Sequence, residues 1–475
     1  FQYTSIYLTA GSLNTVGVSP GSITPGDCVM FAYDADAGLM WFGVNGKWND
    51  GANPASGSNS DWTSLPTTGL APFAGVYGIA IKIDINFGQK PFKYAPPDGF
   101  QPLNAANVRP ETVIVRPNQF IGATTYDGLG TGVSNAKDVL FNFNPDLCWL
   151  KMKSSTGSHY IWDTVRGFGD NELRSNGTSS EGYNAAYYTI TKLDKGFKIQ
   201  QDSPGNEVNS SGNTYVCWSW KAGGNKNTFN KDDVGYASAA ASGLDGGSLA
   251  VTGASVGTKQ GFSIIKTNLP DSSTASTFSH GLNQAPDFAI VKPTGVSFQW
   301  DVYHSSLGKD AYLVLDSTAA QVTSATTVWN STAPTSSLFS LGTAWPGGPG
   351  TGEPIIAYLW HDVPGLQKFG SYGGADAFVE LGFRPAVLII KSLSSSRNWI
   401  IIDGVRDTFN PSDRALLVND GSTEDDNSVY AIDFLSNGFK IRGSNGQIDG
   451  DSSYIYAAWA EAPTVNLFGA QSNAR

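Results

Sequence analysis

The stretch that decides the fold is present twice: residues 149–167 read WLKMKSSTGSHYIWDTVRG, and residues 389–407 read IIKSLSSSRNWIIIDGVRD. Aligned without a gap, the copies share a lysine, an aspartate and an arginine: Lys151 and Lys391, Asp163 and Asp403, Arg166 and Arg406. Each copy has two short apolar runs around a Ser-rich turn, a pattern typical of two adjoining strands. A catalytic centre needs one copy, so the duplication indicates a repeated structural unit.

A weaker third copy lies between these two. The copies begin with a strand after proline, PDLCWLK (145–151), PDFAIVK (286–292) and PAVLIIK (385–391). They end with an apolar strand that carries a tryptophan at one equivalent position, namely Trp220, Trp360 and Trp459. Because large aromatic side chains at strand positions dominate sandwich cores, we predict that these three tryptophans are core residues rather than a ligand platform.

The second strand of each copy carries an acid. The alignment places Asp301 of QWDVYH beside Asp163 and Asp403, with His304 in place of the arginine. Such acids could anchor a glycan in each module. Because they recur in copies that otherwise differ, we favour a structural role, in which each aspartate accepts backbone N–H bonds at a strand end.

Composition favours an all-β chain. Of 475 residues, 55 are glycine, 12% are aromatic and only 15% are charged, which suits strands joined by tight turns. We predict four tandem β-sandwich domains: a first sandwich at 1–105, and repeat modules at 106–224, 261–365 and 366–475. The Gly/Ala-rich stretch 225–260 reads as a connector with one short strand.

The first domain has a sequence pattern of its own. GDCVMFAYDADAGLMWFGVNGKW (26–48) alternates apolar and polar residues and turns at 36–38 and at Asn45–Gly46, and Asn-Gly between apolar runs is a strong hairpin signal. Residues 85–104 should close the domain with a strand and a proline-broken tail. Together with NFGQKPFKYAPPDGF (86–100), this region resembles the phage-borne SPRY domain, a concanavalin-like β-sandwich, with its first strands missing.

The three copies have a resemblance as well. HGLNQAPDFAIVK (280–292) and KFGSYGGADAFVELGFRPAVLIIK (368–391) are similar to repeat modules of tail-fibre and other virion proteins of marine phages. The resemblance implies a virion protein on the particle surface, an adhesin that presents non-catalytic sandwiches to a host-surface glycan beside other virion proteins. By analogy with phage fibres, we expect a homo-oligomer, a trimer. The alternatives are a purely architectural capsid or tail decoration, and a polysaccharide-degrading tailspike.

Several functions are disfavoured by residue content. The net charge of −11 and the lack of a basic run argue against nucleic acid as a partner, and no apolar run is long enough for membrane insertion. We expect no cofactor and no metal site, since no C-x-x-C occurs and the four histidines are dispersed. The acidic segment DGSTEDDN (420–427) reads as a solvated loop, with a weak calcium site as the alternative.

No catalytic residues are predicted. A nucleophile elbow needs a strand before the serine and a helix after it. In the G-x-S-x-G matches at 17–21 and 253–257, turn residues follow Ser19 and a strand pattern follows Ser255. A Glu-x-Asp-x-x-Glu pattern, carried by retaining sandwich glycosidases, is also missing. Cys148 and Cys217 lie in apolar strand patterns and read as buried free thiols, with a bridge between them as the alternative.

Recognition is predicted in two loops that carry tryptophan among turn residues. KWNDGANPASGSNSDW (47–62) holds Trp48 and Trp62, and GTAWPGGPGTG (342–352) holds Trp345. An exposed indole offers a flat apolar face to a sugar ring, so these three tryptophans are the candidate binding residues. The alternative is that they fold back over the sandwich edge or pack against a neighbouring subunit.

Overall fold

The computed structural model describes residues 6–10, 14–18, 24–34, 37–65, 84–88, 90–100, 102, 113–167, 171–182, 187–203, 208–269, 274–345, 352–373 and 376–463. In this part of the chain the regular structure is all β-strand apart from single turns of 3-10 helix, which confirms the predicted all-β class. None of its helices is long and apolar enough to cross a membrane. The chain divides into two compact units, residues 1–111 and 112–475.

The N-terminal unit contains the predicted hairpin. Strands β3 (Val29–Asp34), β4 (Leu39–Val44) and β5 (Lys47–Trp48) pair antiparallel. The second turn has positive φ at Asn45 (52°) and Gly46 (83°), the backbone for which Asn-Gly is favoured. Strands β1 (Ile6–Ala10) and β2 (Asn14–Val18) form a second pair. The strand expected within 85–104 is not found among the described residues of that range.

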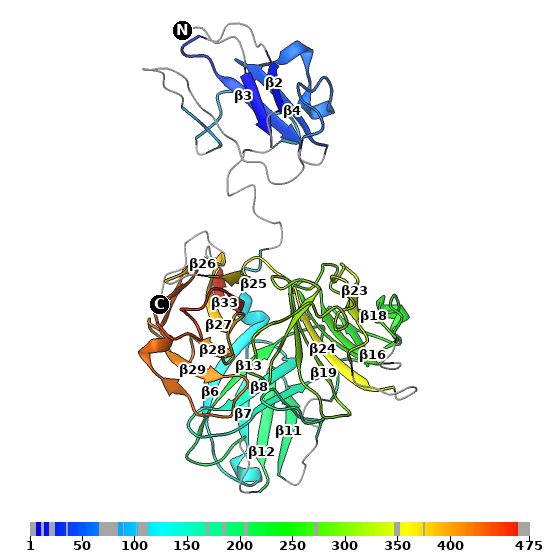
Figure 1. The fold of residues 1–475 in the computed structure, drawn as a ribbon, viewed down its shortest axis with the longest axis vertical. Helices are drawn as coiled ribbons and strands as arrows, with labels where there is room; N and C mark the ends of the chain where they lie inside the picture. The colour runs from blue at the N-terminus through cyan, green and yellow to red at the C-terminus, as the bar shows by residue number, and fades with distance from the viewer. Residues whose placement is uncertain are drawn as a thin grey trace. The chain divides into compact units, whose positions relative to one another are not determined.

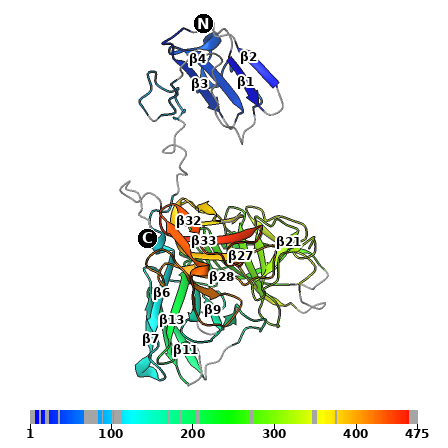
Figure 2. The ribbon, with the colours of Figure 1, turned by 60° about the vertical axis from the view of Figure 1, so that its left-hand side comes forward.

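The C-terminal unit holds the three repeats, which the structure bounds as module 1 (113–224), module 2 (225–365) and module 3 (366–463). Figures 1 and 2 show them as three lobes that share one centre. Each module has an inner sheet and an outer sheet. The inner strands of module 1 are β6 (Ile121–Asp127), β8 (Leu147–Met152), β9 (His159–Asp163), β10 (Leu173–Arg174) and β13 (Thr214–Trp220). Its outer strands are β7 (Lys137–Leu140), β11 (Tyr188–Leu193) and β12 (Gly196–Gln201).

Modules 2 and 3 repeat this order. The inner strands of module 2 include β17 (Phe262–Asn268), β19 (Phe288–Pro293), β20 (Asp301–His304), β21 (Ala311–Val314), β22 (Val322–Thr323) and β24 (Pro354–Trp360), and its outer strands are β18 (Ser276–Ser279) and β23 (Leu338–Leu341). The inner strands of module 3 are β25 (Gln367–Tyr372), β27 (Phe383–Ser392), β28 (Ile400–Asp403), β29 (Arg414–Leu417), β30 (Asp425–Asp426) and β33 (Tyr454–Pro463). Its outer strands are β26 (Phe378–Glu380), β31 (Ile432–Leu435) and β32 (Gly438–Ile441).

The central inner strands of each module, such as β8, β13, β19, β24 and β28, are buried on both faces, which explains their continuous apolar runs. On β13, Trp218 and Trp220 face a core shared by all three modules, whereas Tyr215 and Cys217 face the sandwich core of module 1. Strands β24 and β33 alternate in the same way between the shared core and the cores of modules 2 and 3. Because successive side chains of a strand point to opposite faces, one strand serves two cores.

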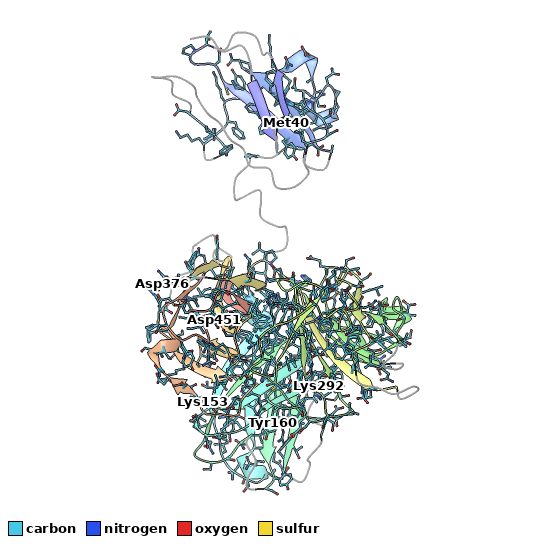
Figure 3. The ribbon with its side chains drawn as sticks, in the orientation of Figure 1. Met40, Lys153, Tyr160, Lys292, Asp376 and Asp451 are labelled. Atoms are coloured by element: carbon cyan, nitrogen blue, oxygen red, sulfur yellow. The ribbon has the colours of Figure 1, made fainter. Side chains whose placement is uncertain are left out.

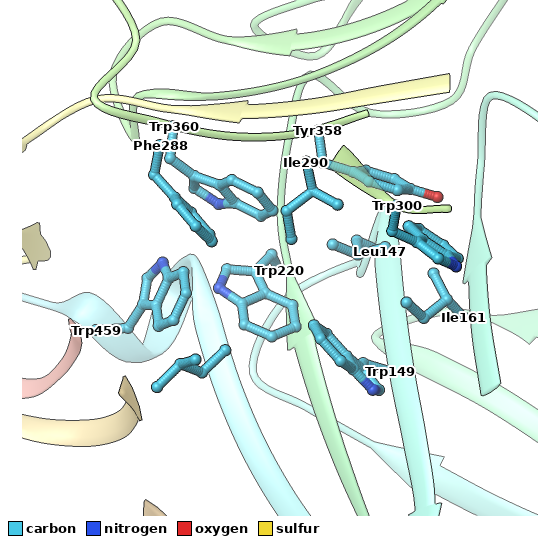
Figure 4. Close-up of a pocket in the computed structure, with 11 residues that line it drawn as sticks. Leu147, Trp149, Ile161, Trp220, Phe288, Ile290, Trp300, Tyr358, Trp360 and Trp459 are labelled. Atoms are coloured by element: carbon cyan, nitrogen blue, oxygen red, sulfur yellow. The ribbon is translucent and has the colours of Figure 1, made fainter. Parts of the chain in front are cut away.

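The three equivalent tryptophans meet in the shared core, as Figure 4 shows. The ring centroids of Trp220, Trp360 and Trp459 are 5.3, 6.0 and 6.3 Å apart in pairs, and each indole is almost fully buried. The prediction that they are core residues is confirmed. The space enclosed by this cluster is about 10 Å³, which leaves room for no more than a water molecule.

Two expectations about domain organisation are wrong. The modules are not separate domains in a row, because they bury their inner sheets against one another in a single core. The stretch 225–260 is more than a connector: β14 (Phe229–Lys231), β15 (Val234–Tyr236) and β16 (Val251–Gly257) extend the inner sheet of module 2 beyond β17. Of these three strands, only β16 has the length of an ordinary strand. The other two are short and lie in a Gly-rich stretch, so the local sequence pattern did not predict them.

Candidate functional site

The lysine shared by all three copies lies at the seam between two modules. Lys292 Nζ of module 2 donates to Thr178 O of module 1 (3.0 Å), and Figure 3 marks this lysine. The equivalent bonds are Lys391 to Thr318 O, at 2.9 Å, and Lys151 to Gly421 O, at 3.1 Å. Module 2 therefore binds module 1, module 3 binds module 2, and module 1 binds module 3. The three modules close a ring within one chain.

Backbone pairs repeat at the same seams. In each seam a backbone N–H donates to the same carbonyl oxygen that accepts the hydrogen bond of the lysine. The module that carries this carbonyl donates one backbone hydrogen bond in return. The first set is Gly157 N to Gly421 O, Phe298 N to Thr178 O and Arg397 N to Thr318 O, at 2.8–2.9 Å. The return set is Glu424 N to Lys153 O, Glu181 N to Thr294 O and Gln321 N to Leu393 O, at 2.7–3.2 Å. This equivalence makes the ring approximately threefold symmetric.

An aromatic N–H adds a further repeated contact. Trp300 Nε1 donates to Arg174 O at 3.0 Å, and Trp399 Nε1 donates to Val314 O at 2.9 Å. His159 takes the same place in module 1, with Nε2 2.9 Å from Leu417 O. Its Nδ1 accepts from Trp149 Nε1 at 3.0 Å, so the imidazole is neutral with its proton on Nε2. Burial and the nearby Lys151 hold the pKa of His159 well below its ordinary value.

Asp163 and Asp403, the aspartates of the repeated segment, make a second set of contacts between modules. Asp163 Oδ1 accepts the backbone N–H groups of Val165 and Arg166 at 2.9 Å. Its Oδ2 accepts from Arg166 Nε at 2.5 Å and from the hydroxyl of Tyr358 in module 2 at 2.7 Å. Arg166 also pairs with Glu181 at 3.2 Å. The predicted structural role of Asp163 is confirmed.

Module 3 repeats this network against module 1. Asp403 accepts from its own turn, from Arg406 Nε at 2.6 Å and from Trp218 Nε1 at 2.9 Å. Arg406 pairs with Glu424 at 3.0 Å. Burial alone would lower the pKa of both guanidinium groups, but the adjacent carboxylates raise it above the ordinary value.

Module 2 departs from this pattern, and the sequence alignment of its acid is wrong. Strand pairing places His304 opposite Phe288, as Asp163 is opposite Leu147 and Asp403 opposite Val387. His304 is therefore the equivalent of the two aspartates. Its Nδ1 accepts from Ser306 N at 3.1 Å and its Nε2 lies 3.2 Å from Tyr456 O of module 3. Burial lowers the pKa of His304 to about 4, so the histidine is neutral at pH 7.

The whole ionic set is replaced in module 2. Three residues after His304 stands Leu307, which packs against the shared core where the other modules have arginine. Gln321 occupies the place of Glu181 and Glu424. Removing one member of a buried ion network would leave an uncompensated charge, so a coordinated change to neutral residues is the stable alternative.

Asp301 lies three residues before His304 and has no arginine partner among the described residues. Its Oδ1 accepts from Gln299 Nε2 at 2.6 Å, and burial raises its pKa to about 7. Burial also lowers the pKa of Lys292 and of Lys391 to about 8. Desolvation disfavours the charged form of each of these three side chains. The hydrogen bonds that they make are all to other groups of the protein.

The predicted tryptophan sites do not form exposed platforms. Trp345 is 2% exposed, and its Nε1 donates to Val328 O at 3.0 Å. Trp62 is 3% exposed and pairs with Met40 through the backbone. Trp48 is half-buried against the small core around Trp41. The premise of an exposed indole is wrong for Trp62 and Trp345, because turn residues carry these side chains back onto the sandwich edge.

Other sequence candidates are occupied by structural contacts. Ser255 is buried within β16 and donates to Gly224 O at 2.8 Å, while Ser19 lies outside the described residues. In the acidic segment, Glu424 pairs with Arg406, and Asp426 with Arg414. No group of three metal-ligating side chains suited to a cation is found among the described residues. Cys148 and Cys217 are buried free thiols with their sulfur atoms 3.2 Å apart.

A groove of about 490 Å³ opens on the surface between modules 1 and 2. Val165 of module 1 forms one side, and the other side comes from module 2: Thr228, Thr252, Lys266, Asn268 and Pro354. Sequence reasoning missed this groove, because Val165 lies far along the chain from the rest. It also missed the seams, although a lysine repeated in a strongly apolar strand is a usable signal of a buried, bonded ammonium group.

A family described only as a domain of unknown function, DUF7483, matches residues 116–463. This range begins just before the first strand of module 1 and ends with the last strand of module 3. No curated protein matches the chain. No solved structure matches it either.

Proposed function

The chain belongs to the DUF7483 family, and we propose that it is a non-catalytic structural protein of a phage virion, of tail-fibre type, that attaches to host-surface glycans. The observation that carries this proposal is the use of the repeated polar side chains. Lys151, Asp163, Arg166 and their counterparts bond to other modules or to their own turns. Such residues build a rigid body, and recognition commonly lies in loops that a rigid scaffold positions.

The resemblance of the N-terminal unit to SPRY domains and of the modules to marine phage virion proteins supports the same proposal. The closed ring supports it as well, because the apolar faces of all three inner sheets are buried within a single chain. A particle exposed to the environment benefits from such a body, because opening one inner sheet would expose part of the core that all three modules share.

An antibody against the purified chain tests the location. Gold-labelled antibody should mark one site on virions of the phage that encodes the chain, and antibody pre-absorbed with the chain should not. Unlabelled virions would refute the proposal. A fluorescent form of the chain should also bind intact host cells, and a heat-unfolded sample serves as the control.

A purely architectural role is the second candidate. It is favoured by the burial of Trp62 and Trp345, which removes two expected glycan contacts. Labelled virions combined with no binding of the chain to host cells would select this role. Turnover of host polysaccharide by the purified chain would instead identify a tailspike enzyme and contradict both.

A further inference from the structure

We propose that the groove between modules 1 and 2 binds an acidic saccharide, a sugar chain that carries carboxylate or sulfate groups. This inference deepens the proposed attachment role, on which it rests, by naming the ligand class and its site. The groove volume of about 490 Å³ falls within the range of small-ligand sites, and boundaries between domains are common places for them.

The groove exists because module 2 has additional strands. Thr228 precedes β14, and Thr252 lies on β16, both within the stretch that has no counterpart in modules 1 and 3. At Gly253 the pairing of β16 with β17 shifts register. A Cβ atom at Gly253 would lie 3.1 Å from Val165 Cγ1, so a side chain at this position would crowd Val165, which lines the groove.

The polar groups of the groove suit a hydroxyl-rich ligand. Lys266 Nζ and the Asn268 side-chain amide have no hydrogen-bond partner in the described part of the chain. Thr252 Oγ1 donates to Lys266 O at 3.2 Å and keeps its lone pairs available. Val165 and Pro354 add an apolar surface for the face of a sugar ring. Free donors beside apolar patches are the usual composition of a polar-ligand site.

The charge of the residues that line the groove favours an acidic sugar over a neutral one. The chain has a net charge of −11, yet none of the described residues that line the groove is Asp or Glu, and among these residues only the half-buried Lys266 carries a formal charge. A partly desolvated ammonium group favours an anionic partner. A single lysine is too little for nucleic acid, whose binding requires several phosphate contacts.

Isothermal titration calorimetry of the full chain with three probes tests this inference: oligogalacturonate for carboxylates, a sulfated dextran for sulfate esters, and neutral dextran as the comparison. We expect at least one anionic probe to bind and neutral dextran to bind at least about tenfold more weakly. Lys266→Gln should weaken anionic binding by about tenfold. The matched control is Lys309→Gln, a change of the same charge at an exposed position.

Thr228→Val adds a variant that keeps the charge and removes one hydroxyl, and its expected effect is a smaller loss of affinity. All variants should keep the melting temperature of the wild-type chain, since the side chains of Lys266 and Thr228 are not part of a buried network. Three results would overturn the inference: no binding of either anionic probe, equal binding of neutral dextran, or equal losses from Lys266→Gln and Lys309→Gln. Virion labelling is independent of these results, so failure of the groove and failure of the virion proposal are distinguishable.

Discussion

Replacing Asp163 by asparagine should open the seam between modules 1 and 2. The side chains of Asp163 and Arg166 are both fully buried, and the substitution would leave the guanidinium without the carboxylate that it contacts at 2.5 Å. Glu181 remains at 3.2 Å, but it is partly exposed and holds the other side of the guanidinium. The hydroxyl of Tyr358 would also lose a charged acceptor.

Breaking a buried ion pair by removing one partner costs about 3–5 kcal/mol, because an uncompensated charge stays in the interior. We therefore expect Asp163→Asn to lower the free energy of unfolding of the C-terminal unit by that amount. An exposed pair gives the scale of an ordinary ionic contact. Asp138 and Lys198 lie 3.6 Å apart with about half of each side chain exposed, so Asp138→Asn should change stability by less than about 1 kcal/mol.

The chain itself supplies a rescue. Module 2 carries His304, Leu307 and Gln321 where module 1 carries Asp163, Arg166 and Glu181, so the triple variant Asp163→His/Arg166→Leu/Glu181→Gln copies a set that already closes a seam. Because no buried charge remains, we expect it to recover at least half of the stability lost in Asp163→Asn.

Urea unfolding at pH 7, followed by tryptophan fluorescence and circular dichroism, measures these differences through the midpoint and slope. A loss below about 1 kcal/mol for Asp163→Asn would refute the reasoning, because the network would then be solvated. A triple variant less stable than the single variant would show that the modules do not exchange their seam residues.

Three further changes test the seams and the corrected positions. Asp301 has a pKa of about 7 when folded against about 4 when unfolded. Between these two pH values the folded state binds more protons than the unfolded state, so the free energy of unfolding should fall as pH rises from about 4 to about 7. Asp301→Asn should remove this pH dependence and raise the free energy of unfolding at pH 8 by on the order of 2–4 kcal/mol. For Lys292 the pH dependence of stability has the opposite sign, because its pKa of about 8 in the folded state lies below its ordinary value. Its contribution makes stability rise between pH 8 and about 10.5. Lys292→Met should abolish that rise, measured as melting temperature against pH. Trp345→Ala should lower the free energy of unfolding by about 3–5 kcal/mol in urea titrations, the usual cost of removing a buried indole. An unchanged midpoint would show that Trp345 is exposed.

The sequence by itself determined the local elements. The repeated strand–turn–strand segment, the hairpin at Asn45–Gly46 and the tryptophans of the closing strands follow from alternation, turn chemistry and apolar content, which are properties of neighbouring residues. The structural role of Asp163 follows in the same way, because its backbone partners lie two and three residues further along the chain.

Only the tertiary structure decided how the modules meet. Local patterns state that a strand is buried on both faces, but not which sheet covers each face, so the shared core around Trp220, Trp360 and Trp459 could not be predicted. Register depends on cross-strand pairing, and a shift of three residues in one short strand moved the role of the acid from Asp301 to His304. The groove likewise joins Val165 to Lys266 across a seam, and a contact between distant segments is fixed only when the whole ring closes.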